Sequence, residues 1–366
     1  MRKIRLILVG GFLGAGKTTL LVSAARLLAG RGSKVGIITN DQAAGLVDTE
    51  IVKREHAGVR EVAGGCFCCR FGELISSLKR LLSDFSPDVV LAEPVGSCTD
   101  LSATVLQPLK KLYPEIIAVA PFSVLVDPTR LREALSPDGT SLFPDSVNYI
   151  FRKQMEEADL IVLNKVDLLS QEQVSDLRAM IDEHFPARPL LTMSALDDRE
   201  VGTWLELVMG EKPAGQRIAR IDYDTYARGE AELGWLNATV ELQSERGADW
   251  SRFSRDFLVR MRDALRARSA DVAHLKVLLS DGGGSITGNL TSLDAEASVR
   301  GSIAGGSGRA TLLVNARVHL APDQVQTLVE EAIRLAAGDS IHVRISAIRS
   351  FRPGRPEPTH RFDHVV

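Results

Sequence analysis

Residues 10–20 read GGFLGAGKTTL and follow a short apolar run at residues 4–9. The stretch from Gly11 to Thr18 fits G-x-x-x-x-G-K-[ST], a pattern that binds phosphate where a strand passes into a helix. The apolar run predicts that strand, and the spacing of apolar residues after Leu20 predicts that helix. Glycines let backbone N–H groups turn inward around a phosphate, and the start of the helix adds partial positive charge. We therefore predict a nucleotide-binding protein.

Each position of this loop has an expected role. The expected contacts to the phosphates come from Gly11, Gly14, Ala15, Gly16, Lys17, Thr18 and Thr19. The Lys17 ammonium can reach the β- and γ-phosphates, and the Thr18 hydroxyl is placed to ligate Mg²⁺. A glycine-rich turn without a ligand is the alternative, but it would not require a strand, a lysine, a threonine and a helix in register.

Size and composition narrow the class of protein. A chain of 366 residues is long for one compact core, so two domains are expected. The net charge of −3 gives no reason to expect nucleic acid as a partner. No apolar run approaches the roughly 20 residues that span a bilayer, and the start of the chain lacks the cleavage site of a signal peptide. We expect a cytoplasmic protein without a membrane partner.

A second buried strand is predicted at residues 34–40. It leads into Asp41, and the polar segment up to Asp48 and Glu50 is expected to be a loop. In phosphate-loop enzymes the end of this strand faces the γ-phosphate and Mg²⁺, so Asp41 and Asp48 are candidate metal or switch residues. Either carboxylate could instead be a solvated loop residue or a helix cap.

The sequence GGCFCC at residues 64–69 places three thiols within four positions on a glycine turn. Such thiols can converge on one soft cation such as Zn²⁺ or Cu⁺, and redox or structural use is the alternative. Three thiolates leave a tetrahedral site one ligand short. The fourth ligand could be His56, Asp41, Cys98, solvent or a partner, and the sequence does not choose among them.

Buried strands are predicted at residues 88–93 and 116–127, and the first of them ends in an acid, Glu93. A carboxylate at this end of a parallel strand, near a phosphate loop, sits beside Mg²⁺ or the attacking water. Gly96 follows and could offer its backbone N–H to the γ-phosphate. Cys98, just beyond, is expected to be a small packed residue and not a ligand.

The strand pattern at residues 161–167 ends in N-K-x-D, formed by Asn164, Lys165 and Asp167. The Asp167 carboxylate can accept both N1–H and N2–H of guanine, a pair of donors that adenine does not present. The stem of Lys165 would lie over the base, and Asn164 would tie this loop to the phosphate loop. A second strand leads into Ser194 and Ala195, where a backbone N–H could meet guanine O6. These features favour GTP over ATP.

The motifs stand in one order: phosphate loop, C-x-C-C, a strand ending in E-x-x-G, and N-K-x-D. Over about residues 4–210 this order resembles the CobW-like metallochaperone GTPases, relatives of the urease and hydrogenase nickel-insertion GTPases. The resemblance implies an α/β fold, a P-loop GTPase with a mostly parallel sheet, of a class that dimerises with nucleotide. It also implies that Cys66, Cys68 and Cys69 bind Zn²⁺, Co²⁺ or Ni²⁺ and that delivery to a client metalloprotein is coupled to GTP hydrolysis.

The catalytic set that follows from this resemblance is Lys17, Asp41 and Glu93. The family's usual N-E-F-G after the second strand reads NDQA here, at residues 40–43. Asp41 therefore keeps the carboxylate but is one methylene shorter. No glutamine or arginine stands out as the residue that positions the attacking water, so slow intrinsic turnover is expected.

The second half predicts a smaller α+β domain with an antiparallel sheet. The expected boundaries are 1–212 for the GTPase domain, 213–233 for a linker, 234–350 for the C-terminal domain and 351–366 for an irregular tail. Strands are predicted at 236–242, 272–279, 286–290, 295–303, 310–320 and 341–348, and helices at 250–267 and 322–337. The arginines of the helix at 250–267 are interleaved with acids, which favours a solvated face over a nucleic-acid site.

Two functions of different classes follow from these patterns. The leading hypothesis is a GTP-hydrolysing metallochaperone that binds Zn²⁺ or Co²⁺ through C-x-C-C and delivers it to a client. The second is a GTP-gated interaction or remodelling chaperone for a cobalamin or metal enzyme, with structural cysteines. A small-molecule kinase is disfavoured, because N-K-x-D would then have no purpose.

Overall fold

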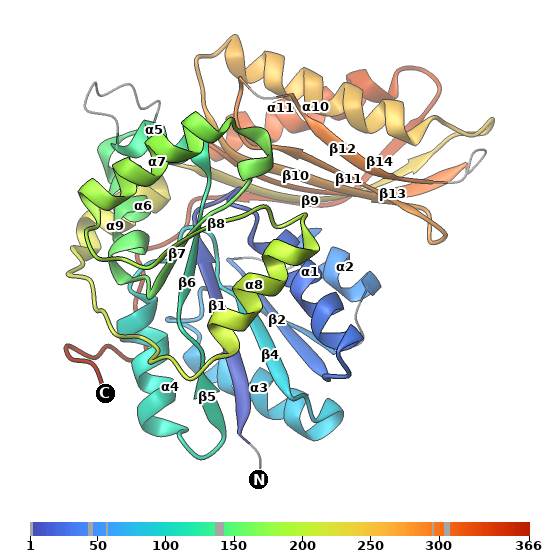
Figure 1. Cartoon of the computed structure of the whole chain (residues 1–366). Coiled ribbons are helices and arrows are strands. Elements are labelled where there is room, and N and C mark those ends of the chain that lie inside the picture. The colour runs from blue at the N-terminus through green and yellow to red at the C-terminus, as the bar shows by residue number, and fades with distance from the viewer. Residues whose placement is uncertain (1–2, 43–46, 56–57, 136–142, 295, 304–307) are drawn as a thin grey trace. The chain divides into compact units, whose positions relative to one another are not determined.

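The computed structural model describes residues 3–42, 47–55, 58–135, 143–294, 296–303 and 308–366 (Figure 1). They form two compact units, each built on one sheet. Unit 1 consists of Met1–Gln42, Val52–Gly229 and Arg355–Val366. Unit 2 consists of Ala43–Ile51 and Glu230–Gly354. Unit 2 is thus assembled from two separate stretches of chain and unit 1 from three.

Unit 1 is organised around a parallel sheet of eight strands in the order β3-β2-β4-β1-β6-β7-β8, with β5 also paired to β1. The strands are β1 (Ile4–Gly11), β2 (Val35–Asp41), β3 (Val59–Ala63), β4 (Val89–Glu93), β5 (Ile117–Val119), β6 (Ser123–Val126), β7 (Leu160–Leu163) and β8 (Leu190–Thr192). The central strand β1 has β4 on one side and β6 on the other. Strand order reverses there, and open α/β sheets bind ligands at such a point. The predicted parallel sheet is confirmed.

Helices connect these strands. They are α1 (Lys17–Gly30), α3 (Phe71–Phe85), α4 (Gln107–Leu112), α5 (Pro128–Leu135), α6 (Asp145–Glu157), α7 (Gln171–His184), α8 (Asp198–Met209) and α9 (Tyr223–Ala231), with a π-helical turn η1 (Ser102–Leu106) and a 3₁₀ turn η2 (Val166–Leu168). Helices α1 and α8 share one buried cluster with alternate residues of the sheet, such as Ile7 and Ile37. Helix α3 lies on the other face, where Leu81 approaches Gly36. Helix α9 falls within residues 213–233, for which the sequence predicts a linker.

Two local predictions are wrong. The segment with Asp48 and Glu50 was expected to be a loop, but it is helix α2 (Val47–Glu55). Both acids lie in its first turn, where negative charge stabilises a helix start, and Thr49 is fully buried. Residues 116–127, predicted as one strand, form two, β5 and β6. Pro121 lies between them and has no N–H to donate to a strand ladder.

Unit 2 has an antiparallel sheet in the order β12-β11-β10-β13-β9-β14, which confirms that prediction. Its strands are β9 (Gly234–Gln243), β10 (Val272–Ser280), β11 (Ser285–Leu290), β12 (Ser298–Ser302), β13 (Arg309–Val318) and β14 (His342–Phe351), and its helices are α10 (Trp250–Arg266) and α11 (Pro322–Ala337). The helices and alternate strand residues form one apolar core. The first residues of α2 belong to this unit: the Val47 N–H donates to Asn315 Oδ1 at 2.8 Å, and Lys276 pairs with Asp48.

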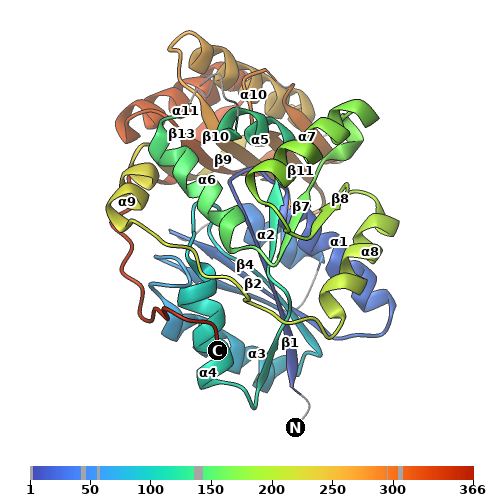
Figure 2. The ribbon, with the colours of Figure 1, turned by 60° about the vertical axis from the view of Figure 1, so that its left-hand side comes forward.

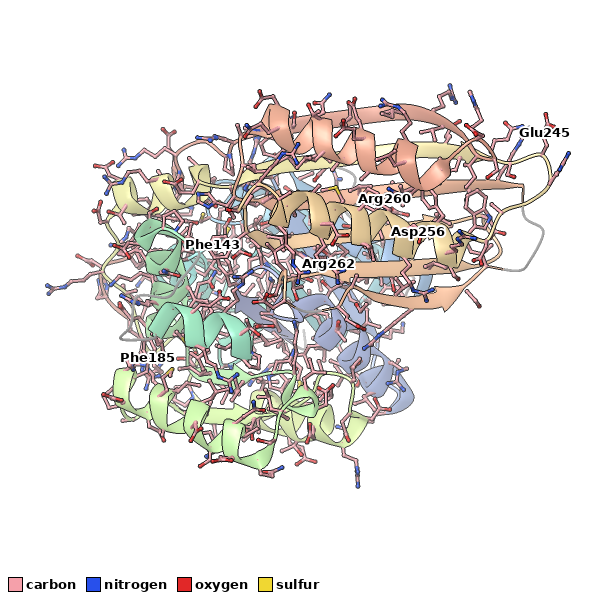
Figure 3. All side chains as sticks on the ribbon, turned by 90° about the horizontal axis from the view of Figure 1, so that it is seen from above. Phe143, Phe185, Glu245, Asp256, Arg260 and Arg262 are labelled. Carbon is pink, nitrogen blue, oxygen red and sulfur yellow. The ribbon has the colours of Figure 1, made fainter. Side chains whose placement is uncertain are left out.

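Charged side chains line the exposed side of α10, where Figure 3 labels Asp256, Arg260 and Arg262. Arg252 lies 3.5 Å from Asp256, and Arg262 lies 3.4 Å from Asp263. The acids therefore neutralise part of the positive charge of this helix.

Among the residues that the structure describes, no helix combines the length and the hydropathy that a membrane crossing needs.

Candidate nucleotide and metal site

The phosphate loop has the backbone conformation that only glycine adopts readily. Gly11, Gly14 and Gly16 have φ values of +130°, +80° and +97°. A Cβ on Gly11 would lie 2.3 Å from the Leu125 carbonyl oxygen, and a Cβ on Gly16 would lie 2.4 Å from Asn164 Nδ2. Helix α1 begins directly behind, at Lys17. The loop therefore wraps into a cradle at a helix N-terminus, the arrangement that suits a phosphate.

Lys17, Thr18 and Glu93 meet at this cradle. Lys17 is buried, and its Nζ donates to the carbonyl oxygens of Gly11 at 2.9 Å and Phe12 at 3.3 Å. It also lies 3.9 Å from Glu93 Oε1. The Thr18 hydroxyl donates to the same Glu93 oxygen at 3.1 Å. A hydroxyl beside a carboxylate is an oxygen donor set that fits Mg²⁺.

Asp41 and Gly96 lie at or just beyond the ends of the neighbouring strands β2 and β4. Asp41 ends β2, is buried, and accepts the Gln42 N–H at 2.7 Å. β2 pairs with β4, with Thr39 opposite Glu93. A Cβ on Gly96 would lie 2.7 Å from the Leu13 side chain of the phosphate loop. Thr19, by contrast, is exposed on α1.

Asn164 joins the phosphate loop to the loop that contains Ser194 and Ala195. It is buried, its Nδ2 donates to the Ala15 carbonyl at 2.8 Å, and its Oδ1 accepts the Ala195 N–H at 2.9 Å. The Ser194 N–H donates to Glu200 at 2.6 Å. The N–H groups of Ser194 and Ala195 are thus already engaged within the protein.

Lys165 and Asp167 lie beyond Asn164. Lys165 has a φ of +62°, and its Nζ donates to Asp127 Oδ2 at 2.7 Å. Asp167 lies in η2 and is exposed. Asp127 was not identified from the sequence as a site residue, although an acid directly after a buried strand is a signal that could have found it.

The three thiols of the C-x-C-C turn converge. The Sγ of Cys66 lies 2.8 Å from that of Cys68 and 3.2 Å from that of Cys69, and the latter two are 3.7 Å apart. Cys66 and Cys68 are buried, and Cys69 is half-buried. Hydrogen bonds from Cys68, Cys69 and Cys98 hold the pKa of Cys66 well below its usual value. Hydrogen bonding with Cys66 and burial raise the pKa of Cys68 well above its usual value and that of Cys69 to about 11.

Asn40 positions this turn, a role that no sequence motif indicates. Its Nδ2 donates to the carbonyl oxygens of Val62 at 2.8 Å and Gly65 at 2.7 Å, and its Oδ1 accepts the Phe67 N–H at 2.9 Å. Asn40 precedes Asp41 at the end of β2. The end of β2 therefore carries both Asp41, a candidate residue of the nucleotide site, and Asn40, which holds the cysteine turn.

The C-terminal segment Arg355–Val366 covers the cysteine turn within unit 1. The Glu357 N–H donates to Cys69 Sγ at 3.2 Å, and the Thr359 N–H donates to the Cys68 carbonyl at 2.9 Å. The His360 ring meets Phe71 edge-on, with centroids 5.0 Å apart. The segment ends beside α4 (Figure 2), where the Val366 N–H donates to Gln107 at 3.0 Å.

The remaining candidate residues are placed elsewhere. Asp48 lies in α2 and pairs with Lys276 of unit 2. His56 lies outside the described residues. Cys98, expected to be a packed residue, is buried.

Comparison with known proteins gives one family. The family described as CobW/HypB/UreG, nucleotide-binding domain, matches residues 5–192, just over half of the chain.

Individual relatives match a similar stretch. The zinc chaperone CobW of Pseudomonas aeruginosa is 29% identical over 213 residues, which cover 51% of this chain and 55% of that one. The zinc chaperone YeiR of Escherichia coli is 30% identical over 187 residues, which cover 50% and 53%. The crystal structure of HypB from Helicobacter pylori in complex with nickel aligns with a TM-score of 0.40 and 15% identity, over 57% of this chain and 86% of that one. The chain spans little more than half the length of these two zinc chaperones.

Proposed function

Because the chain belongs to the family of CobW/HypB/UreG nucleotide-binding domains, we propose that it is a GTPase that binds a divalent metal and delivers it to a client protein. The names of its relatives support zinc as the cargo, and Co²⁺ or Ni²⁺ suits the same thiols. One observation carries the proposal. Asn40 holds the cysteine turn at the end of β2, next to Asp41 and one strand away from Glu93.

In this proposal the phosphates of GTP lie in the cradle of the phosphate loop. Lys17 leaves the carbonyl oxygens of Gly11 and Phe12 and binds the β- and γ-phosphates. Thr18 holds Mg²⁺, which, when bound, neutralises charge on the phosphates. Glu93 and Asp41 orient the attacking water beside the Gly96 N–H. Turnover is slow until a second copy or the client adds a group that positions the water.

Guanine would be recognised at the other end of the site. Asp167 is exposed and available to accept the N1–H and N2–H donors of guanine. Lys165 exchanges its ion pair with Asp127 for contact with the face of the base. Guanine O6 would approach Ser194 and Ala195. It would accept a hydrogen bond from one of their N–H groups, which donate to Glu200 and Asn164 in this structure.

The metal would bind at Cys66, Cys68 and Cys69. Three sulfurs within 3.7 Å of one another suit one soft ion, and they are the group of potential ligands that the described residues bring together. Because β2 carries both Asp41 and Asn40, a change at the γ-phosphate can reach the cysteine turn through one strand end. Nucleotide state and metal affinity are therefore coupled, and the coupling is reciprocal.

The test is an anaerobic titration of the full chain with Zn²⁺ and Co²⁺, in the presence of Mg²⁺ with a GTP analogue, with GDP, or without nucleotide. Thiolate coordination is read from the charge-transfer absorption of Co²⁺. A Cys66→Ser, Cys68→Ser, Cys69→Ser triple variant is run alongside. We expect metal affinity that depends on the nucleotide and is lost in the variant. Identical affinity in all three nucleotide states would contradict the proposed coupling.

The burial of Cys66 and Cys68 favours a second candidate, a GTP-gated interaction or remodelling chaperone with structural cysteines. In that case the triple variant still binds a client in a GTP-dependent way, and metal affinity does not respond to nucleotide. The same titration therefore separates the two functions.

A further inference from the structure

The C-terminal segment contacts the cysteine turn through hydrogen bonds at two successive cysteines. The Glu357 N–H donates to Cys69 Sγ at 3.2 Å. The Thr359 N–H donates to the Cys68 carbonyl at 2.9 Å, and the Thr359 hydroxyl donates to the Cys69 carbonyl at 3.2 Å. A proline stands on each side of Glu357 and restricts the backbone there. The half-buried thiol of the turn is therefore bounded by this segment.

Arg361 anchors the segment just beyond these contacts. Its Nε donates to Asp100 Oδ2 at 2.7 Å, and its Nη2 donates to the Ala219 carbonyl at 3.3 Å. The next residue adds a backbone hydrogen bond, from the Phe362 N–H to the Ala103 carbonyl at 3.0 Å. The side chain of Asp100 is 1% exposed, so this ion pair reaches into the interior of unit 1.

The buried carboxylate makes this anchor stronger than an ordinary surface contact. Asp100 Oδ2 also accepts the Tyr223 hydroxyl at 2.7 Å, whereas its Oδ1 is buried without a hydrogen-bond partner among the described residues. Loss of Arg361 would leave a buried charge uncompensated, which is strongly unfavourable. At the other end of the segment, Arg355 pairs with Asp224 at 2.8 Å, but both side chains are exposed, and such pairs contribute little. The segment is therefore held mainly at Arg361.

The anchor lies on the loop that follows Glu93 at the end of β4. Residues 94–100 of this loop are all buried. The loop starts against the phosphate loop, since a Cβ on Gly96 would lie 2.7 Å from the Leu13 side chain. Asp100 follows four residues later. The loop thus extends from the phosphate cradle to the residue that anchors the C-terminal segment.

We propose that the C-terminal segment is a cover for the cysteine turn, that the ion pair between Arg361 and Asp100 is its latch, and that metal reaches and leaves the thiols when this latch opens. A further step rests on the proposed function. A change at the γ-phosphate that shifts the loop after Glu93 also shifts Asp100, and the cover is released. The nucleotide then controls the rate of metal exchange as well as the affinity for metal.

The rates of metal exchange test the cover. Zinc-loaded full-length protein with Mg²⁺ and a GTP analogue is mixed with a chromophoric chelator, and uptake is measured by adding Zn²⁺ to the metal-free protein. We expect Arg361→Met to speed release and uptake at least about tenfold each, with a change in Kd below about threefold, because an opened cover affects both directions. Asp100→Asn removes the charge on the other side of the latch and should speed both rates too.

The matched control is Arg355→Met, which removes an arginine of the same segment whose ion pair is exposed. Its exchange rates should equal those of the wild type. Wild-type rates in Arg361→Met, despite bound zinc, would overturn the cover and leave the proposed function intact. Equal wild-type release rates with GTP analogue and with GDP would overturn the nucleotide step alone.

Hydrogen–deuterium exchange tests the latch without metal. In metal-free protein the amides of Glu357 and Thr359 should be protected in the wild type and in Arg355→Met, and should exchange at least about tenfold faster in Arg361→Met. Equal protection in all three proteins would overturn the latch. A wild type that binds no zinc at the thiols would overturn the proposed function and the metal gate together, and the amides would still decide the latch.

Discussion

The side chain of Asn40 holds the cysteine turn through three hydrogen bonds, two as donor and one as acceptor. Replacement by alanine leaves the Phe67 N–H and two carbonyl groups in the interior without this partner. A buried group that loses its partner costs about 1–3 kcal/mol. We predict that Asn40→Ala weakens Zn²⁺ binding roughly ten- to hundredfold, as measured by competition with a chromophoric chelator.

The matched control is Asn289→Ala in unit 2, which should leave zinc affinity unchanged. Unaltered zinc affinity in Asn40→Ala would show that the turn keeps its shape without this side chain.

A second prediction for a single residue concerns the selection of the base by Asp167. Asp167→Asn replaces an acceptor of two guanine donors with an amide that can donate to the O2 of xanthine. Hydrogen bonds to a charged group contribute about 1.5–3 kcal/mol, so GTP affinity should fall about ten- to hundredfold while XTP affinity rises. Binding of fluorescent GTP and XTP analogues measures both. A parallel loss of both nucleotides would place Asp167 outside the base site.

Motif residues could be found in the sequence because their chemistry fixes both residue type and spacing. The phosphate loop, Glu93 and N-K-x-D follow strands whose carboxyl ends share one sheet edge. The role of Asn40 could not be assigned in this way. Its partners, Val62, Gly65 and Phe67, lie 22–27 residues away in the sequence, and an asparagine near the end of a strand has no characteristic spacing.

At the scale of elements, Glu157 joins the end of α6 to the loop before η1. It is fully buried, accepts the Thr99 hydroxyl at 3.2 Å and accepts the Ser102 N–H at 2.8 Å. Burial raises the pKa of Glu157 well above its usual value, and the nearby charge of Asp100 adds to the effect. A carboxyl group with a raised pKa in the folded state favours folding most when it is protonated, below its unfolded pKa. That contribution is lost as the pH rises through the folded pKa.

We predict that Glu157→Gln becomes progressively more stable than the wild type as the pH rises from 5 to 8. A glutamine can still accept the Ser102 N–H and can donate to Thr99, but it does not ionise. The measurement is chemical unfolding of metal-free protein at each pH, and the unfolding free energies of variant and wild type are compared at the same pH. A difference in unfolding free energy that stays constant across this range would contradict the raised pKa.

The elements themselves were predictable where periodicity is long and clear. The strands β1, β2, β4 and β7 and helix α11 were predicted within a few residues, whereas the short strand β3 was not predicted. Helix α2 was missed because it is short and polar, and its buried residues, such as Val47 and Thr49, do not follow a clear apolar stripe. Residues 116–127 were misjudged because a continuous apolar run does not reveal that Pro121 interrupts the ladder.

At the scale of the whole molecule, unit 1 is completed by a segment that follows unit 2 in the sequence. The segment covers Cys69 and contacts Cys68 and Asp100. We predict that truncation after Gly354 speeds the reaction of the cysteines with a thiol reagent at least about tenfold, because a covering segment is removed. Timed absorbance of the released chromophore measures this rate.

The matched control is truncation after Phe362, which removes the final residues but keeps Glu357, Thr359 and Arg361. It should react at the rate of the full chain. Equal rates for all three proteins would show that the segment does not shield the thiols.

The same C-terminal segment has a consequence for the nascent chain during translation. Glu357 is made 288 residues after Cys69. At the usual translation speed of about 5–20 residues per second, this separation corresponds to roughly 15–60 s. During that interval the thiols have already left the ribosome, but the C-terminal segment that will cover them has not yet been synthesised. Translation thus gives ions and oxidants around the ribosome a period of access to the cysteines, and this period ends when β14 and the segment after it emerge.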